Sequence, residues 1–435
     1  MNFDDAVRYL LSLGHETLAL KLGLRTTEVL LSALGNPQTC YPSVQIAGTN
    51  GKGSTAVVLD SICRAAGIRT GLFTSPHLIR ITERIRINGQ EISQNTFAEV
   101  ATTVRDRAED LVKANELAAP PTFFEQVTAI ALLTFKQASV DLAILETGLG
   151  GRLDSTTVAR AGTVGITQIA LDHQEYLGNT LEEIAAEKAA IIRPNVTAVI
   201  APQVPAALSL ITQRCADVNV IPRLNGCQAE VLGATGDARL RVTFRTKYDC
   251  YQEVLLGLRG RYQLVNVSLA IQLAESLRER GFQIPREAVI RGIEQARHSG
   301  RLELIEGEPA LLFDGAHNPA GALALRDYLD EFVTQPITLV FGAMRDKSLE
   351  EMARALFPRA RRLILTEPDN ARAASLEMLQ KCATGAIEEQ VIALEPSARK
   401  AIKLAFAQTP RDGLICVTGS LYLIGEIQEA LGRHQ

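Results

Sequence analysis

The sequence has no strong excess of either charge and no dense run of basic residues. Its 435 residues include 45 Lys and Arg against 49 Asp and Glu, which gives a formal net charge of -4 at pH 7. Proteins that bind nucleic acid carry a basic patch or stripe on their surface. We therefore expect no nucleic-acid partner and favour a small-molecule ligand.

Long apolar runs and paired cysteines are also absent. No apolar run approaches the length that a helix needs to cross a bilayer, and the first ten residues, MNFDDAVRYL, are acidic and amphipathic, unlike a signal peptide. The seven cysteines are scattered and never spaced as C-x-x-C, which argues against a disulfide framework or a zinc knuckle. We expect a cytoplasmic protein with reduced thiols and no membrane contact.

Apolar residues make up 46% of the chain, which is enough to form buried sheets. A chain of 435 residues is too long for one compact core and predicts more than one domain. From residue 43 to residue 200, short apolar runs alternate with helical patterns, which favours an α/β fold with a doubly wound, mostly parallel sheet. Residues 230–258 instead indicate a small antiparallel patch around Gly236-Asp237. Renewed βα alternation predicts a second, smaller α/β domain. We expect domains at residues 1–298 and 299–435, with a hinge near Ser299-Gly300.

The periodicity of apolar residues also predicts the individual elements. Helices are expected up to about residue 34 and then at 54–64, 96–114, 122–137, 181–192, 262–280 and 285–297. Strands are expected at 43–47, 70–74, 140–145, 163–169, 310–313, 337–341, 363–366 and 414–418, and a charged, alternating hairpin at 80–92.

The stretch SVQIAGTNGKGST, residues 43–55, is typical of a strand, a glycine loop and the start of a helix. Its glycines let the backbone turn its N–H groups inward, and the helix dipole and the Lys52 ammonium would attract phosphate. The pattern departs from the usual nucleotide loop, because Ile46 stands where the first glycine would be and Gly53 separates Lys52 from Ser54. The alternative is an ordinary glycine turn between a strand and a helix.

Polar side chains follow three of the expected strands. Ser75, Glu146 and His173 each come after an apolar run, and the carboxyl ends of parallel strands share one edge of the sheet. Because magnesium prefers oxygen ligands, Ser75 and Glu146 fit a magnesium site better than His173 does. A carboxylate without a partner would be costly at the end of an apolar strand, so a functional role is favoured for Glu146. His173 could equally cap a helix or lie in the core.

Two further segments permit a functional and an ordinary interpretation. Lys188 lies in AAEKAAII, a helix with little other charge, where it is either a solvated surface group or a partly buried lysine with a lowered pKa. The segment DGAHNP, residues 314–319, follows a strand and precedes a helix. It would suit a binding loop that faces the first domain, or an Asx turn that caps the helix.

In their order and spacing, these motifs resemble those of folylpolyglutamate synthases and of bifunctional dihydrofolate synthase/folylpolyglutamate synthases, members of the Mur ligase superfamily. The resemblance covers nearly the whole chain. It rests on AGTNGKGS (47–54), TSPHL (74–78), LETGLGGRLD (145–154), LDH (171–173), EKA (187–189), GR (300–301), DGAHNP (314–319) and GSLY (419–422).

The resemblance implies a P-loop domain like the Mur ligase central domain, followed by a smaller Rossmann-like C-terminal domain. It also implies an ATP-dependent ligase that adds L-glutamate to folates, and to dihydropteroate as well, through an acyl phosphate. ATP and Mg²⁺ would be its cofactors, and the resemblance also allows a K⁺ ion as a further cofactor. We expect a monomer whose partners are these small molecules.

The resemblance further assigns roles to individual residues. ATP would be held by Gly48, Thr49, Asn50, Gly51, Lys52, Gly53, Ser54, Asn266, Arg301 and Asp314. Magnesium would be bound by Ser75, Glu146, His173 and a carbamylated Lys188, and the catalytic groups would be Lys52, Lys188 and His317. Glutamate would contact Arg84, His317 and Ser420. The pterin would lie against Thr122, Phe123, Phe124, Glu125, Leu153, Asp154 and Ser155, with a weaker match at Leu20 to Leu22.

Four positions depart from the family pattern: Thr157 replaces an asparagine, Ala190 a glycine, Tyr262 a histidine and Ser299 a proline. Tyr262 bears on adenine packing and Ser299 on the stiffness of the hinge.

The alternatives to this function are a monofunctional folylpolyglutamate synthase, a peptidoglycan-precursor Mur ligase, a P-loop regulatory ATPase and a folate-binding protein without activity. The sequence leaves open the use of dihydropteroate, the polyglutamate length and the carbamylation of Lys188.

Overall fold

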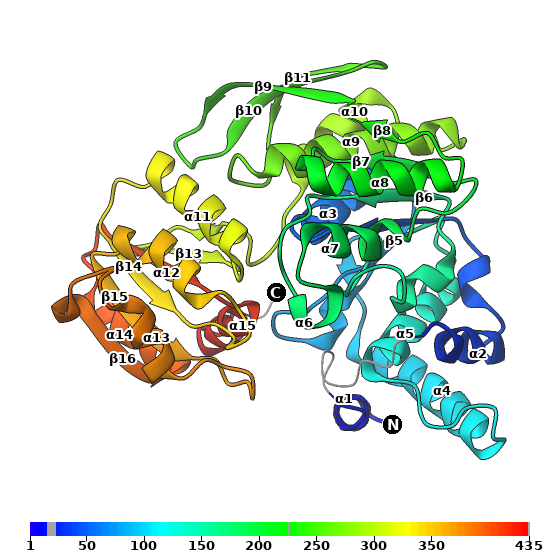
Figure 1. Cartoon of the computed structure of the whole chain (residues 1–435), viewed down its shortest axis with the longest axis horizontal. Coiled ribbons are helices and arrows are strands. Elements are labelled where there is room, and N and C mark those ends of the chain that lie inside the picture. The colour runs from blue at the N-terminus through cyan, green and yellow to red at the C-terminus, as the bar shows by residue number, and fades with distance from the viewer. Residues whose placement is uncertain (15–22, 225, 434–435) are drawn as a thin grey trace.

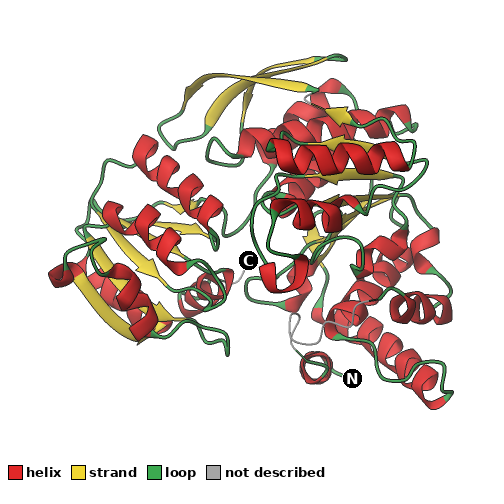
Figure 2. Cartoon of the chain, viewed as in Figure 1, coloured by secondary structure: helices red, strands yellow, loops and turns green. Residues whose placement is uncertain are grey.

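The chain forms two α/β lobes, which Figures 1 and 2 show side by side. The computed structural model describes residues 1–14, 23–224 and 226–433. We call the chain from α1 through α10 the first lobe and the chain from β12 through α15 the second lobe. The predicted domain boundary between residues 298 and 299 falls in the segment between them and stays a prediction.

The helices of the first lobe are α1 (Phe3–Ser12), α2 (Arg25–Ala33), α3 (Lys52–Ala65), α4 (Gln94–Lys113), α5 (Phe123–Gln137), α6 (Gln174–Leu177), α7 (Leu181–Ala189), α8 (Pro205–Asp217), α9 (Gln263–Glu279) and α10 (Arg286–Gln295). Its strands are β1 (Ser43–Ala47), β2 (Thr70–Phe73), β3 (Ile85–Ile87), β4 (Gln90–Glu91), β5 (Leu142–Glu146), β6 (Thr163–Ile166), β7 (Thr197–Ile200), β8 (Arg223–Leu224), β9 (Cys227–Ala234), β10 (Leu240–Thr246) and β11 (Cys250–Leu255).

The large sheet of the first lobe has the strand order β4-β3-β2-β5-β1-β6-β7-β8. All neighbours pair in parallel except at the β3 and β4 edge. Side chains of β5 alternate between two cores: Leu142 and Ile144 pack with α3 and α9, whereas Ala143 and Leu145 pack with α4 and α5. Helices therefore cover both faces, which confirms the doubly wound, mostly parallel sheet.

A second sheet of the first lobe, β11-β10-β9, is antiparallel and confirms the predicted patch. Phe244 and Tyr251 bury its inner face in the core that contains α9. The turn between β9 and β10 reaches the second lobe, because Ala238 is part of the buried core that contains Tyr328. Arg259 donates to Asp237 in the same turn. This turn therefore joins the two lobes at one end of the molecule.

The second lobe contains β12 (Glu303–Ile305), β13 (Ala310–Asp314), β14 (Ile337–Phe341), β15 (Arg362–Glu367), β16 (Ile392–Ser397) and β17 (Leu414–Thr418), with helices α11 (Pro319–Phe332), α12 (Leu349–Leu356), α13 (Leu376–Ala383), α14 (Ala398–Gln408) and α15 (Leu421–Ala430). Its sheet has the order β12-β13-β17-β14-β15-β16 and is parallel except at β12. This arrangement confirms the second α/β unit.

Several predicted elements differ in extent from those observed. The expected opening helical stretch is divided into α1 and α2, and its part at residues 15–22 lies outside the described residues. Helix α3 begins at Lys52, two residues earlier than expected, and the expected hairpin at 80–92 pairs as β3 and β4 with the edge of the large sheet.

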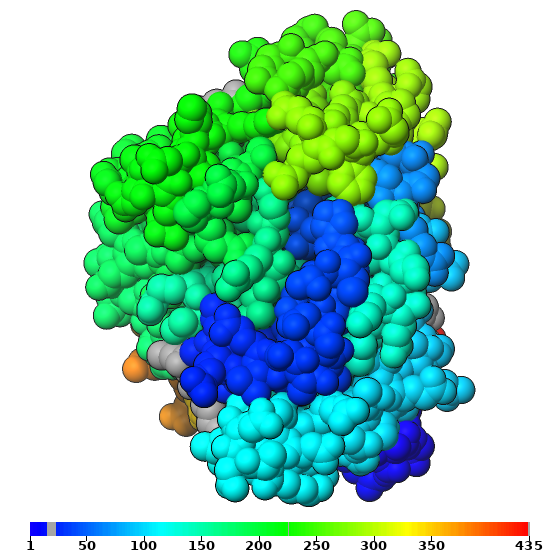
Figure 3. Space-filling model, turned by 90° about the vertical axis from the view of Figure 1, so that its right-hand side faces the viewer, coloured from blue at the N-terminus to red at the C-terminus, as the bar shows by residue number. Residues whose placement is uncertain are grey.

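Figure 3 shows the side of the first lobe where α4 lies at the lower end and segments near α10 at the upper end. Across the described ranges, every helix is too short or too polar to cross a membrane.

Candidate functional site

A cavity of about 370 Å³ is lined by residues of both lobes. Most residues predicted for the site line it. They are Thr49, Asn50, Gly51, Lys52, Gly53, Ser54, Ser75, Thr122, Phe124, Glu125, Glu146, Leu153, Asp154, Ser155, His173, Lys188, Asn266, Arg301, Asp314, His317 and Ser420. Gly48, Arg84 and Phe123 are not among the lining residues, and Leu20 to Leu22 lie outside the described residues.

The glycine loop joins β1 to α3 at the floor of the cavity. A Cβ at Gly48 would lie 1.8 Å from Thr167 Oγ1, and one at Gly51 would lie 2.0 Å from Asn266 Oδ1, so both positions require glycine. The N-terminus of α3 has no side-chain cap, so its first N–H groups are available to an anion. Lys52 Nζ donates to Thr49 O at 3.2 Å, which holds the ammonium beside the loop. The loop thus has the geometry of a phosphate cradle.

Ser54, at the start of α3, lies close to a histidine that the sequence analysis missed. His298 Nδ1 lies 3.1 Å from Ser54 Oγ, and Gln263 Nε2 donates to the same oxygen at 3.3 Å. Burial, reinforced by the charge of Arg301, lowers the pKa of His298 to about 3, so its ring is neutral near pH 7. His298 also lines the cavity. It stands in no motif of the sequence, and only the fold brings it to the loop.

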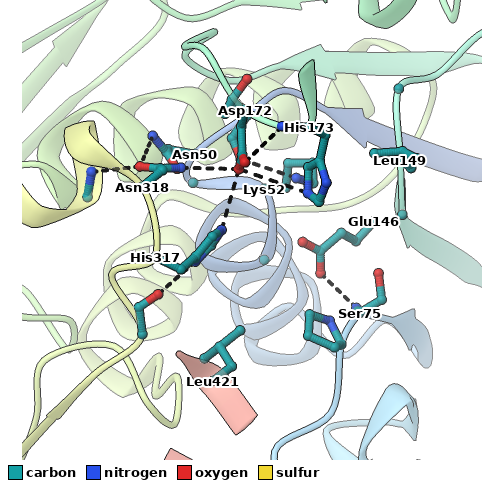
Figure 4. Close-up of a pocket in the computed structure, with 18 of the residues that line it drawn as sticks. Asn50, Lys52, Ser75, Glu146, Leu149, Asp172, His173, His317, Asn318 and Leu421 are labelled. Atoms are coloured by element: carbon teal, nitrogen blue, oxygen red, sulfur yellow. Dashed lines mark hydrogen bonds and ion pairs between the residues drawn. The ribbon is translucent and has the colours of Figure 1, made fainter. Parts of the chain in front are cut away.

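Glu146 ends β5 and points into the cavity towards Ser75 (Figure 4). Ser75 N donates to Glu146 Oε2 at 3.1 Å. Burial raises the pKa of Glu146, and the charge of Lys52 opposes that shift. Among the described residues, no three His, Cys, Asp or Glu side chains form a metal-binding group. A buried carboxylate beside a hydroxyl nevertheless suits a hard cation that takes its remaining ligands from phosphate and water.

Lys188 is buried in α7 and lines the cavity, which excludes the surface interpretation of this lysine. Its exposed fraction is 4%. Burial, together with the charge of Lys52, lowers the pKa of Lys188 to about 7. A substantial fraction of the side chain is therefore a neutral amine near pH 7. Such an amine is nucleophilic enough to be modified, and a modification that removes its positive charge would relieve the repulsion from Lys52.

His173 follows β6 and lies near the carboxylate of Asp172 (Figure 4). Burial is the main cause that lowers the pKa of His173 to about 3; the charge of Asp172 opposes this shift, and the charges of Lys347 and His317 add to it. The ring is therefore neutral and can serve as a metal ligand. His173 occupies the cap position of α6 with φ 51°, yet its side chain makes no capping hydrogen bond.

The segment after β13 both caps α11 and lines the cavity. Asn318 accepts from Gly321 N at 2.8 Å, which confirms the predicted Asx cap. Asp314 accepts from Leu302 N and Ala316 N, each at 3.0 Å. Burial raises the pKa of Asp314, although the charge of Arg301 opposes this shift. The Asx cap is therefore confirmed and the segment also lines the cavity, whereas its role as a binding loop stays a prediction.

Comparisons with known proteins agree with this geometry. The Mur ligase middle domain family matches residues 46–274, and the Mur ligase glutamate ligase domain family matches residues 300–421. The dihydrofolate synthase/folylpolyglutamate synthase of Bacillus subtilis is 34% identical over 423 residues, 96% of this chain and 97% of that protein. The chain belongs to the folylpolyglutamate synthase family of Mur ligases.

Solved structures of this family have the same fold. The folylpolyglutamate synthase of Mycobacterium tuberculosis complexed with ADP is 29% identical, with a TM-score of 0.92 over 99% of this chain and 98% of that one. A bifunctional folylpolyglutamate synthase/dihydrofolate synthase with Mn, AMPPNP and L-glutamate bound is 27% identical, with a TM-score of 0.86 over 99% and 98%. Some relatives are longer: the chain spans 51% of a 35% identical probable bifunctional folylpolyglutamate synthase/dihydropteroate synthase from Halobacterium salinarum, and 98% of the chain is matched.

In this folylpolyglutamate synthase family member, the wall predicted for the pterin is held by local hydrogen bonds. Glu125 accepts from Thr122 N at 2.7 Å in a capping box at the start of α5. Asp154 accepts from Leu149 N at 2.9 Å and Thr156 N at 3.0 Å, and so fixes the glycine-rich turn after β5. Both carboxylates face the cavity from a fixed backbone, because each also organises its own loop.

Arg84, predicted to bind glutamate, is buried with an exposed fraction of 2% and is not among the residues that line the cavity. Its Nε donates to His77 Nδ1 at 2.8 Å, and its guanidinium lies 5.4 Å from the centre of the Phe123 ring. Phe123 is likewise buried. These two side chains support the wall of the cavity, and their contact with substrate stays a prediction.

The lowered pKa of the buried Lys188 makes the free energy of unfolding depend on pH. The native state gives Lys188 a pKa of about 7 in place of 10.5, so between these pH values the unfolded chain holds a proton that the native chain lacks. We expect the free energy of unfolding, relative to Lys188→Met, to rise by about 1.4 kcal/mol per pH unit over this interval and to level off below it. Urea unfolding in CO₂-free buffer measures the slope. Parallel curves for the two proteins would contradict the low pKa.

Proposed function

We propose that this protein adds L-glutamate to the carboxylate of folates and of dihydropteroate in an ATP-dependent reaction. The proposal is carried by one observation: a single cavity between the lobes is lined by Lys52, Glu146, Lys188 and His317. The curated relative of nearly equal length is a dihydrofolate synthase/folylpolyglutamate synthase, and one solved relative holds Mn, AMPPNP and L-glutamate. The ligands of that relative support a nucleotide, a divalent cation and glutamate as ligands of this chain.

The first step overcomes the low reactivity of a carboxylate. A carboxylate attacks the γ-phosphoryl group of ATP, the bond to the ADP oxygen breaks, and an acyl phosphate forms. Lys52 and the N–H groups at the start of α3 stabilise the phosphoryl charge. Ser75, Glu146, His173 and a carbamylated Lys188 would hold Mg²⁺, which supplies further positive charge when bound. Asn266, Arg301 and Asp314 hold the nucleotide from the opposite side.

The second step forms the amide. The glutamate amine attacks the acyl carbon, phosphate leaves, and the nitrogen loses its proton. His317 and Ser420 belong to the second lobe and would hold glutamate, so closure of the lobes brings the amine to the acyl phosphate. The same closure keeps water from the reactive intermediate. Because one chain supplies all these residues, we propose a monomeric enzyme.

An acceptor assay tests the function. ADP release is measured with ATP, Mg²⁺ and glutamate in the presence of either dihydropteroate or tetrahydrofolate. We expect release with both acceptors, and none beyond background when glutamate is omitted. Release with tetrahydrofolate alone would identify a monofunctional folylpolyglutamate synthase. Release that needs neither acid nor glutamate would identify a nucleotide switch and overturn the proposal.

A further inference from the structure

The carboxylate of Asp172 joins the two lobes across the cavity. Asp172 belongs to the first lobe and has an exposed side-chain fraction of 7%. Its Oδ1 accepts from Lys347 Nζ at 2.7 Å, and its Oδ2 lies 3.2 Å from Asn318 Nδ2 and 3.5 Å from His317 Nε2. These three partners all come from the second lobe. Figure 4 shows Asp172 between His173, His317 and Asn318.

Asn318 extends this contact to the phosphate loop. Its Nδ2 donates to Asn50 Oδ1 at 3.0 Å, and Asn50 Nδ2 lies 3.5 Å from Asn318 Oδ1. Asn50 is part of the loop that would hold the nucleotide. A continuous set of contacts therefore runs from the loop through Asn318 and Asp172 to His317.

The ion pair at the centre of this set is buried. The Lys347 side chain is 8% exposed, close to the value for Asp172. A charge pair shielded from water loses much of its attraction when its members separate. The pair can therefore form only in the arrangement in which the lobes are close.

His317 is held from both sides of its ring. Its Nδ1 lies 2.8 Å from Gly315 O, and its Nε2 faces Asp172. Loss of the second contact would leave the ring free to turn about one hydrogen bond. The ring orientation thus depends on a residue of the opposite lobe.

We propose that Asp172 is a positioning residue that couples nucleotide on the phosphate loop to the binding of glutamate by the second lobe. This inference rests on the proposed function, because it takes glutamate as the ligand beside His317. A nucleotide that orders Asn50 strengthens the contacts through Asn318 to Asp172 and so fixes His317. Glutamate then binds more tightly to the nucleotide complex than to the free protein.

The test compares the full-length protein with Asp172→Asn, which keeps the size of the side chain and removes its charge. Asp346→Asn is the matched control, since Asp346 lies in the second lobe and its ion-pair partners, Lys347 and Arg372, belong to the same lobe. Glutamate binding is measured by calorimetry with and without the ATP analogue AMPPCP, and KM and kcat are measured by ADP release.

We expect AMPPCP to tighten glutamate binding to the native protein and to Asp346→Asn by about 10-fold, a typical coupling between two sites. In Asp172→Asn, AMPPCP should tighten glutamate binding by no more than about 2-fold. The KM for glutamate should rise by about the factor that the coupling loses. Nucleotide affinity in the absence of glutamate should stay within about 3-fold, which a general collapse of the site would not allow. Unchanged coupling in Asp172→Asn, or equal losses of nucleotide and glutamate binding, would overturn the proposal.

A second variant guards against misfolding of the first. Asn318→Ser retains an oxygen that can cap α11 and removes the amide donor that reaches Asp172 and Asn50. It should show the same loss of coupling, and full coupling in this variant would also overturn the proposal. A native protein without glutamate-dependent ADP release would refute the proposed function itself. A native protein with such release and equal coupling in all variants would refute only the role of Asp172.

Discussion

Replacing Lys188 with methionine is expected to lower glutamate-dependent ADP release by about 1,000-fold, the size of effect seen when a central charge-stabilising group is lost. The native amine is buried, has a pKa of about 7 and lies near the charge of Lys52. Reaction with CO₂ would turn it into an anion that can bind the divalent cation. Methionine fills the same space but cannot react. Steady-state ADP release at saturating substrates measures the effect.

Two variants define the meaning of that loss. Lys113→Met alters a lysine that is 71% exposed at the end of α4 and should leave the rate unchanged. Lys188→Glu supplies a permanent carboxylate and should recover part of the activity lost in Lys188→Met. Activity of Lys188→Met within about 10-fold of the native value would contradict a role for Lys188 in the reaction.

Replacing Glu146 with glutamine is expected to lower the same rate by about 100- to 1,000-fold. The variant keeps the shape of the side chain and an oxygen that can accept from Ser75 N. It loses the negative charge that would bind Mg²⁺ beside the phosphate loop. The magnesium concentration for half-maximal activity should rise together with the loss in rate.

A titration of ADP release with MgCl₂ separates the metal effect from a structural one. The control is Glu182→Gln, which removes an exposed carboxylate at the start of α7 and should behave like the native protein. Thermal unfolding should show that Glu146→Gln is folded. A lower rate with an unchanged magnesium requirement would contradict the assignment of Glu146 to the metal.

The sequence predicted most of the central strands because their signal is local, but the inner strand β7 was not predicted although three of its four residues are buried. In β5, the four consecutive apolar residues 142–145 serve two cores at once, so this part of the strand reads as an uninterrupted apolar run. The short edge strands β8, β12 and β16 were not predicted. Each is only partly buried along its length, so its residues show no strong pattern. Their extended form depends on a neighbouring strand that is distant in the sequence.

The site was predictable where its residues stand in compact motifs, as do Lys52 and Glu146. Asp172 stands in the LDH motif but was given no role, and His298 stands in no motif. Asp172 acquires its partners only when Lys347 and Asn318 approach from the second lobe, and His298 meets Ser54 from 244 residues away. The burial of Arg84 against Phe123 likewise depends on tertiary packing and has no local signal.

The turn between β9 and β10 limits how the two lobes can move. Ala238 is embedded in the core of the second lobe, and Arg261 near the start of α9 forms an ion pair with Glu331 of α11. This corner acts as a fulcrum. A swing about it displaces distant groups most, so Lys347 and Asn318 would travel farther than Tyr262. In such a motion the gap would widen at Asp172, on the side where we propose that His317 holds glutamate.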